Sequence, residues 1–189
     1  MLNKALIVAM AATLATLTAA PAYAMASADA APKIEFVFGP KITLREPDST
    51  FTCTAGEVMV DRAHMGDENG WTTYGCAQVL VNGEPASVQT GNWTLAGKES
   101  NSYFAGPLNH VLLGRKHLGD ENGLTSYLTG TLHWRGTQVR LTPRFWTAFA
   151  KERSHSAHGY APQVMTGRQH KGDENGDTRY EYSTVTVDG

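Results

Sequence analysis

The chain has 189 residues, of which 41% are hydrophobic and 18% are charged, and its formal net charge is −2 at pH 7. This length suits one domain with its own hydrophobic core. The sequence has no run of Lys or Arg, which argues against a nucleic-acid partner and against electrostatic binding to an anionic membrane.

Residues 1–24 are predicted to be an export signal. Lys4 gives a positive start, an uncharged apolar run follows, and Ala22-Tyr23-Ala24 has the small-x-small pattern that signal peptidase cleaves after. The apolar run is too short for a membrane span, which needs about 20 residues. A second such pattern, Ala28-Asp29-Ala30, leaves the cleavage point open by about six residues. We therefore expect an exported protein, periplasmic or extracellular, with one mature domain over 25–189.

An internal repeat is the strongest signal in the sequence. The pentapeptide Gly-Asp-Glu-Asn-Gly begins at Gly66, Gly119 and Gly172, and both intervals are 53 residues (119 − 66 and 172 − 119). Three units, 31–83, 84–136 and 137–189, therefore fill the mature chain without insertion or deletion. Every copy reads R-x-H-x-G-D-E-N-G-x-T-x-Y, whereas the apolar positions around this motif differ between copies.

The residues before each pentapeptide are predicted to form a strand. Side chains alternate along a strand, so Val58 and Val60 should share one face with Arg62 and His64. The core face would then end in a cation and an imidazole, as at the rim of a barrel. The Asn-Gly pair should turn the chain, because both residues tolerate a positive φ.

A second strand is expected after each turn, and shorter strands are expected earlier in each unit. The predicted second strands are 72–81, 125–134 and 178–187, and the earlier segments are 34–38, 93–95, 139–141 and 144–149. About four strands per unit, with no helical periodicity, predict an all-β domain. Three units around a pseudo-threefold axis describe a β-trefoil-like fold, with a β-prism as the alternative. A β-propeller needs at least four blades, so three units do not suit that fold.

The two cysteines, Cys53 and Cys76, are predicted to form a disulfide, because an exported chain matures in an oxidising compartment. They flank the first polar loop, so the bond should join the two arms of that hairpin and stabilise the fold by roughly 3–4 kcal/mol. The other units lack this pair and carry Gly106 with Thr129, and Gly159 with Tyr182, at the equivalent positions.

The repeated motif is the candidate ligand-binding site, because it collects the groups that hold sugar hydroxyls. Carboxylates accept hydrogen bonds, Arg donates several, and Asn and His do both. Trp71 adds a ring that stacks on a sugar's apolar face, and Leu124 and Asp177 replace it in the other copies. The candidate residues are Arg62, His64, Asp67, Glu68, Asn69, Trp71 and Tyr74 in the first unit, Arg115, His117, Asp120, Glu121, Asn122 and Tyr127 in the second, and Arg168, His170, Asp173, Glu174, Asn175 and Tyr180 in the third.

A purely structural interpretation of the motif stays open. The pentapeptide is a good turn by itself, Arg62 would then pair with Asp67 or Glu68, and the Tyr hydroxyl would bind a neighbouring backbone carbonyl. A zinc site of His64, His117 and His170 meeting on the axis is a further alternative. His155 and His158 occur only in the third unit and are expected to be ordinary loop residues.

Catalysis is not expected. The sequence contains no H-E-x-x-H, G-x-S-x-G or C-x-x-C motif, no cofactor is expected, and a tripled motif is unlike a single asymmetric active site. We therefore expect a multivalent, lectin-like protein that binds a glycan or polysaccharide. The alternatives are a protein-interaction module, such as an inhibitor of a periplasmic or extracellular enzyme, and a matrix protein whose repeats only specify the fold.

Overall fold

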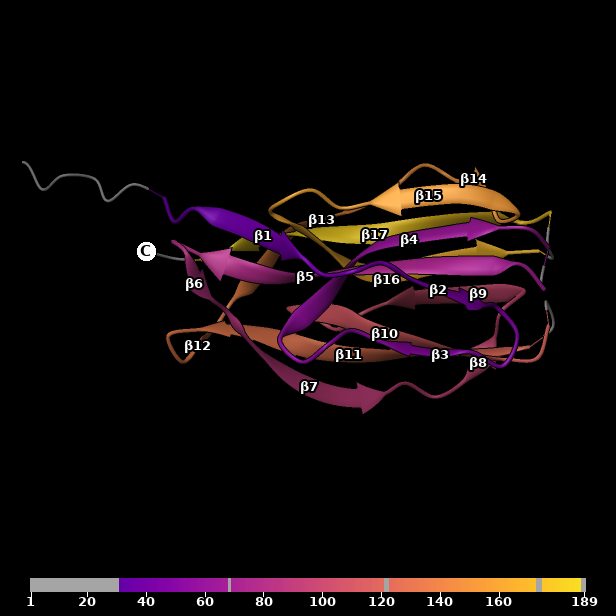
Figure 1. The fold of residues 1–189 in the computed structure, drawn as a ribbon, viewed down its shortest axis with the longest axis horizontal. Helices are drawn as coiled ribbons and strands as arrows, with labels where there is room; N and C mark the ends of the chain where they lie inside the picture. The colour runs from indigo at the N-terminus through magenta and orange to yellow at the C-terminus, as the bar shows by residue number, and fades with distance from the viewer. Residues whose placement is uncertain (1–30, 68, 121–122, 173–174, 188–189) are drawn as a thin grey trace, which may run out of the picture. The chain divides into compact units, whose positions relative to one another are not determined.

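The computed structural model describes residues 31–187, except residues 68, 121–122 and 173–174. The predicted export signal therefore lies outside the described residues. Seventeen strands form three curled antiparallel sheets (Figure 1), and the described part of the chain contains no helix. The prediction of an all-β domain is confirmed.

Each sheet combines strands from more than one repeat. The first sheet consists of β1 (Ile34–Phe38), β2 (Ile42–Arg45), β4 (Glu57–Met65), β5 (Trp71–Val81), β6 (Glu84–Pro85) and β15 (Ser154–His158). The second consists of β3 (Thr50–Thr52), β7 (Ser87–Trp93), β8 (Gly97–Lys98), β10 (His110–Leu118), β11 (Leu124–Trp134) and β12 (Thr137–Gln138). The third consists of β9 (Asn101–Ala105), β13 (Arg140–Trp146), β14 (Ala150–Lys151), β16 (Gln163–Lys171) and β17 (Asp177–Thr186).

A long hairpin forms the centre of every sheet: β4–β5, β10–β11 or β16–β17. Its second strand pairs with an interrupted strand from the same repeat, β1/β2, β7/β8 or β13/β14. Its first strand pairs with a short strand from another repeat, because β15 lies on β4, β3 on β10 and β9 on β16. The third repeat thus returns to the first, and no repeat completes a sheet alone.

A β-bulge changes the face on which the motif side chains lie. The register shifts between Met59 and Asp61, so Val58 is opposite Ala77 but Arg62 is opposite Tyr74. Residues 74 and 77 are an odd number of positions apart on β5, so their side chains lie on opposite faces of the sheet. Residues that are paired across two strands share a face, so Val58 and Arg62 also lie on opposite faces. The predicted common face for the valines and the Arg-x-His pair is therefore wrong. The same shift occurs between Leu112 and Gly114 and between Met165 and Gly167.

The glycines of the motif loop have two separate roles. The first glycine takes a positive φ, 110° at Gly66, 90° at Gly119 and 100° at Gly172. Gly70 does not, so the predicted positive φ at the Asn-Gly pair is wrong there. A Cβ at Gly70 would instead lie 2.4 Å from the carbonyl oxygen of Met65, and that close approach requires glycine.

The strand predictions are largely confirmed, with two corrections. The second hairpin strands agree with prediction within one residue, and β1 spans the predicted range. The segment 93–95 is wrong, because β7 ends at Trp93. His155 and His158 are not loop residues, because both belong to β15.

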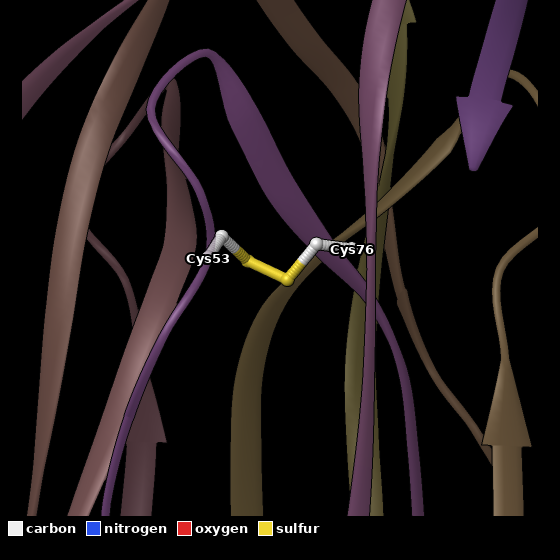
Figure 2. The surroundings of a disulfide bond; sticks show 2 residues. All are labelled: Cys53 and Cys76. Atoms are coloured by element: carbon white, nitrogen blue, oxygen red, sulfur yellow. A yellow bond between two sulfur atoms is a disulfide. The ribbon is translucent and has the colours of Figure 1, made fainter. Parts of the chain in front are cut away.

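The disulfide between Cys53 and Cys76 is present, with a Cα–Cα distance of 5.8 Å (Figure 2). Its topology differs from the prediction. Cys53 precedes β4, and its backbone N–H donates to the carbonyl of Leu113 in β10. Cys76 lies in β5. The bond therefore joins the first sheet to the segment that pairs with the second sheet, rather than joining the two arms of one hairpin.

Two apolar clusters fill the interior, and each contains residues from all three repeats. The first is mainly aliphatic and includes Val58, Val60, Ala77, Val79, Val111, Leu113, Leu132, Val164 and Val185. The second is mainly aromatic and sulfur-bearing and contains Phe51, Met59, Tyr74, Cys76, Leu112, Tyr127, Met165, Tyr180 and Tyr182. Strand alternation places Val58 and Val60 in the first cluster and Met59 in the second, and the bulge places Arg62 on the same face as Met59.

Candidate functional site

The three motif arginines lie inside the domain. Arg62, Arg115 and Arg168 are each 1% exposed, and they occupy equivalent positions after the bulges of β4, β10 and β16. These three strands contact one another, so the side chains of different repeats meet there. Burying a guanidinium costs free energy unless its charge is paired. The stability of this arrangement therefore depends on the groups that pair with the three arginines.

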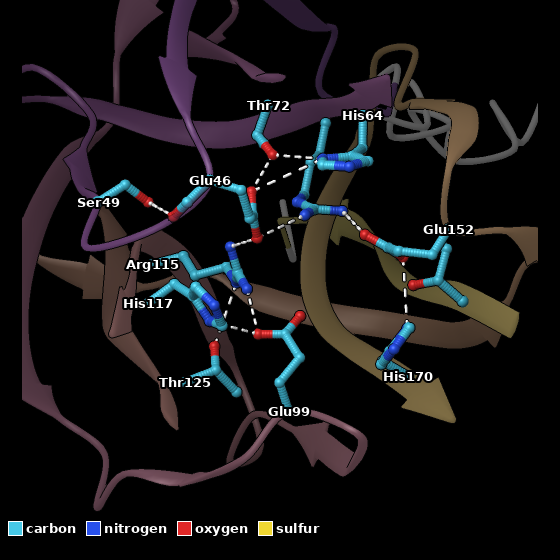
Figure 3. Close-up of polar contacts among 12 residues, drawn as sticks. Glu46, Ser49, His64, Thr72, Glu99, Arg115, His117, Thr125, Glu152 and His170 are labelled. Atoms are coloured by element: carbon cyan, nitrogen blue, oxygen red, sulfur yellow. Dashed lines mark hydrogen bonds and ion pairs between the residues drawn. The ribbon is translucent and has the colours of Figure 1, made fainter. Parts of the chain in front are cut away.

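Three buried glutamates, Glu46, Glu99 and Glu152, pair with these arginines in a closed ring. Figure 3 shows the three glutamates together with Arg115, which pairs with Glu46 and Glu99. Glu46 bridges Arg62, at 3.3 Å, and Arg115. Glu99 bridges Arg115 and Arg168. Glu152 bridges Arg168, at 3.0 Å, and Arg62, at 3.1 Å. Each acid thus joins arginines of two repeats, and three positive charges balance three negative ones.

The ring keeps the buried acids ionised. Burial by itself raises the pKa of Glu46, but the positive charges of Arg115 and Arg62 outweigh it and lower this pKa to about 2. Against the same burial effect, Arg115 and Arg168 lower the pKa of Glu99 well below its usual value. Arg168 and Arg62 do the same to the pKa of Glu152.

The motif histidines connect the ring to the loops. The Nε2 atoms of His64, His117 and His170 lie 2.9–3.1 Å from the carbonyl oxygens of Asp67, Asp120 and Gly172, respectively. On the other side of each imidazole, Nδ1 of His117 lies 2.8 Å from the carboxylate of Glu99, and Nδ1 of His170 lies 3.4 Å from that of Glu152. Nδ1 of His64 contacts Thr72, whose hydroxyl donates to Glu46.

The glutamates also bind the loop backbone directly. The N–H groups of Glu46, Glu99 and Glu152 donate to the carbonyls of Gly70, Gly123 and Gly176, the last glycines of the three pentapeptides, at 2.9–3.0 Å. The first glycine of each loop donates to a turn of another repeat, to Arg153, Asp48 or Ser100. The charged ring and the three loops therefore form one hydrogen-bonded system.

Two predicted contacts of the structural interpretation are wrong in their partners. Arg62 pairs with Glu46 and Glu152 rather than with Asp67, and Glu68 lies outside the described residues. Two of the Tyr hydroxyls accept from arginines rather than binding carbonyls: Arg115 donates to Tyr74 at 3.2 Å, and Arg62 donates to Tyr180 at 2.5 Å. The third, that of Tyr127, has no hydrogen-bond partner among the described residues.

The remaining motif side chains divide sharply by exposure. The Arg, His, Thr and Tyr members are buried in all three copies. Asp67, Asn69, Asp120 and Asn175 are exposed, as are Trp71 and its counterpart Leu124. Glu68, Glu121, Asn122, Asp173 and Glu174 lie outside the described residues.

The glutamates of the ring were missed by the sequence analysis, although a signal exists. They too recur at 53-residue intervals, in the fragments R-E-P-D-S, K-E-S-N-S and K-E-R-S-H that begin at Arg45, Lys98 and Lys151. Only the Glu is identical in all three, so the fragment attracts little attention beside the pentapeptide. A residue-by-residue comparison of the three repeats would have found it.

The three histidines do not form the zinc site considered above. Among the described residues, the group whose ligand atoms come close enough for a metal is Glu46, Glu99 and His117. Arg115 contacts both of these carboxylates. Its guanidinium already supplies the positive charge that a cation would bring, so the residues do not fit a metal ion.

Comparisons with protein families, curated proteins and solved structures give no match. Within the described residues, no helix is long and apolar enough to cross a membrane. In the chain itself, a buried charged ring supports three loops with exposed polar side chains.

Proposed function

We propose that this protein is an exported, non-catalytic, lectin-like protein that binds glycans through its repeated loops. The observation that carries the proposal is the division within the motif. The Arg, His, Thr and Tyr residues are buried, and the histidines bind the backbone of the loops, while Asp67, Asn69 and Trp71 remain exposed beside them. Binding by the buried arginines is not part of this proposal, because in this structure they pair with the ring glutamates.

Trp71 is the residue best placed to stack on a sugar. Its side chain is 51% exposed at the start of β5, directly after the first loop. Arg45 lies over the indole, with Cζ 5.0 Å from the ring centroid, and donates to the carbonyl of Asn69 at 2.7 Å. An aromatic face beside hydrogen-bonding groups matches the two surfaces of a pyranose ring.

Multivalency and export both agree with this function. Three loops on one rigid domain allow avidity to exceed single-site affinity by ~10²–10⁴, which favours retaining three copies. The disulfide between Cys53 and Cys76 favours a protein that matures in an oxidising compartment, either periplasmic or extracellular.

The replacement Trp71→Ala tests the proposal on a glycan array, with Leu124→Ala as the matched control at the equivalent position of the second repeat. We expect the first change to weaken binding about tenfold or more, since stacking contributes on the order of 1–2 kcal/mol. The control should have a much smaller effect. Wild-type protein that binds no glycan on the array would refute the proposal.

A protein-interaction module is the second candidate, and one surface favours it. Phe38 and Tyr160 are 52% and 69% exposed, and their rings lie 5.9 Å and 4.2 Å from that of His158. Exposed aromatic groups of this kind are enriched at protein interfaces. Loss of partner binding after Phe38→Ala, with glycan binding unchanged or absent, would favour this function.

We also infer that the three sheets are related by a pseudo-threefold axis, in the manner of a β-prism rather than of the β-trefoil expected first. The equivalent strand orders of the three sheets and the mutual contact of β4, β10 and β16 support this arrangement. An experimental structure in which the three hairpins do not superpose would contradict it.

A further inference from the structure

The second repeat contains a cavity that two buried hydroxyl groups line. Its volume is about 660 Å³, and Ser102, Phe104 and Tyr127 contribute to the wall. The rings of Phe104 and Tyr127 are stacked, with centroids 4.7 Å apart. Ser102 Oγ and Tyr127 Oη are buried and have no hydrogen-bond partner among the described residues. Buried hydroxyls are normally paired, so these two atoms require an explanation.

The third repeat shows what fills the same position elsewhere in the molecule. His155 and Tyr180 are 53 residues after Ser102 and Tyr127. Nδ1 of His155 lies 2.8 Å from the carbonyl of Glu152, and Nε2 lies 2.5 Å from Tyr180 Oη. Since Nδ1 donates to the carbonyl, Nε2 accepts a hydrogen bond from the tyrosine hydroxyl. The imidazole thus satisfies Tyr180 and fills the space that serine leaves open.

The first repeat satisfies its equivalent groups in another way. Ser49 Oγ donates to the carbonyl of Glu46 at 2.8 Å, and Tyr74 Oη accepts from Arg115 at 3.2 Å. The second repeat therefore differs from both others, because its serine and its tyrosine are both unpaired. The first repeat also has serine at this position, and there the arginine makes the difference: Arg115 donates to Tyr74, whereas Arg168 donates to Glu99 and makes no hydrogen bond with Tyr127. The third repeat differs because His155 replaces the serine.

We propose that this cavity is a saccharide-binding site, in which a sugar hydroxyl takes the position that the His155 imidazole has in the third repeat. The inference rests on the proposed glycan-binding function and names a site for it. A sugar hydroxyl accepts from Tyr127 and exchanges a hydrogen bond with Ser102. Tyr103, which also lines the cavity and is 61% exposed, offers a ring face for the apolar side of the sugar.

The composition of the wall indicates a neutral saccharide. Lys98 is the one charged side chain among the described residues of the lining, and Thr94 and Asn101 add further neutral hydrogen-bonding groups. Such a wall has no pair of cations for a phosphate or a polyanionic sugar. The size of the cavity is within the range of small-molecule sites.

The test is Ser102→His, which copies the third repeat into the second. The histidine should bind Tyr127, occupy the part of the cavity next to this hydroxyl, and keep or raise the melting temperature. The probes are methyl glycosides of glucose, galactose, mannose and N-acetylglucosamine, titrated by calorimetry. We expect the affinity of the bound glycoside to fall tenfold or more. Ser156→His, at an exposed position of β15, is the matched control and should bind like the wild type.

Tyr127→Phe keeps the inference falsifiable if Ser102→His does not fold. It removes one hydroxyl and preserves the ring stacking with Phe104, and the affinity should fall on the order of tenfold. Unchanged affinity in the folded variants, or a crystal structure with saturating glycoside that shows only water in the cavity, would overturn the site while the glycan-binding function stands. Wild-type protein that binds no glycan would overturn both.

Discussion

The aliphatic cluster and the charged ring are both buried, and both take residues from all three repeats, yet their sequences vary differently. In the aliphatic cluster, Val79, Leu132 and Val185 occupy equivalent buried positions and are not identical, although another position is valine in all three copies. The arginines and glutamates of the ring are identical in all three copies. Apolar packing tolerates exchanges that conserve volume, whereas a missing member of the ring leaves a buried charge without its partner.

This contrast gives a structural reason for the repeated Arg-x-His pair. A turn does not require these residues, but a closed ring that joins three repeats requires every member. Each glutamate bridges arginines from different repeats, so the ring fixes the repeats to one another. In the proposed function, the exposed loop residues bind the ligand, while the buried histidines and glutamates hold the loop backbone.

The largest effect should come from Arg115→Ala. Glu46 and Glu99 would both lose a partner, and breaking a buried pair costs about 3–5 kcal/mol of unfolding free energy. Urea denaturation measures this loss. Arg135→Ala is the control, since its pair with Glu84 is exposed, and its denaturation midpoint should hardly move. If Arg115→Ala lost glycan binding with unchanged stability, the ring would belong to a binding site instead.

The second prediction concerns the pH dependence of stability that arises from His155, a residue that is serine in the other two repeats. Burial, followed by the charge of Arg62, lowers the pKa of His155 to about 4, against 6.5 for the ordinary group. The unfolded chain therefore binds more protons between these values, and stability falls as pH decreases from 6.5 to 4. The groups that face this imidazole are Arg62, Glu152, Tyr180, His64 and Arg168.

The variant His155→Ser, which carries the residue of the other repeats, isolates this contribution. Its unfolding free energy should fall less between pH 7 and pH 4, by about 3 kcal/mol, because a shift of one pKa unit corresponds to about 1.4 kcal/mol. The three ring glutamates act at lower pH. Their folded pKa values are depressed, so their contribution to stability is complete above pH 4.5 and is lost as the pH falls below this value, towards about 2 for Glu46. Equal pH profiles of unfolding free energy for His155→Ser and the wild type would contradict the prediction that His155 destabilises the fold below pH 6.5.

The smallest effect is expected for Leu112→Met, which copies the residue found at this position in the first and third repeats, Met59 and Met165. The exchange conserves volume and should cost less than about 1.5 kcal/mol. Leu112→Ala provides the comparison, because the cavity that it creates should cost about 2–5 kcal/mol. Thermal unfolding measures both. A loss from Leu112→Met as large as that from Arg115→Ala would remove the distinction between the two regions.

Local patterns were sufficient for much of the fold. Alternation and turn residues predicted the hairpin strands, and the 53-residue interval predicted three equivalent hairpins. The bulge after Met59 was not predicted, because a bulge is a property of the register between two strands and leaves no mark in the alternation of one. The face of Arg62 depends on it, and so does the burial of the whole motif.

The sequence by itself determined the repeat, the all-β class and the pairing of Cys53 with Cys76, since each depends on spacing, alternation or a count of residues. The tertiary structure alone decided which charges meet. Arg62 pairs with Glu46, 16 residues away, and with Glu152, 90 residues away, in another repeat. Coulombic attraction depends on distance in space and on burial rather than on separation along the chain, so the ring existed only once three sheets had brought its members together.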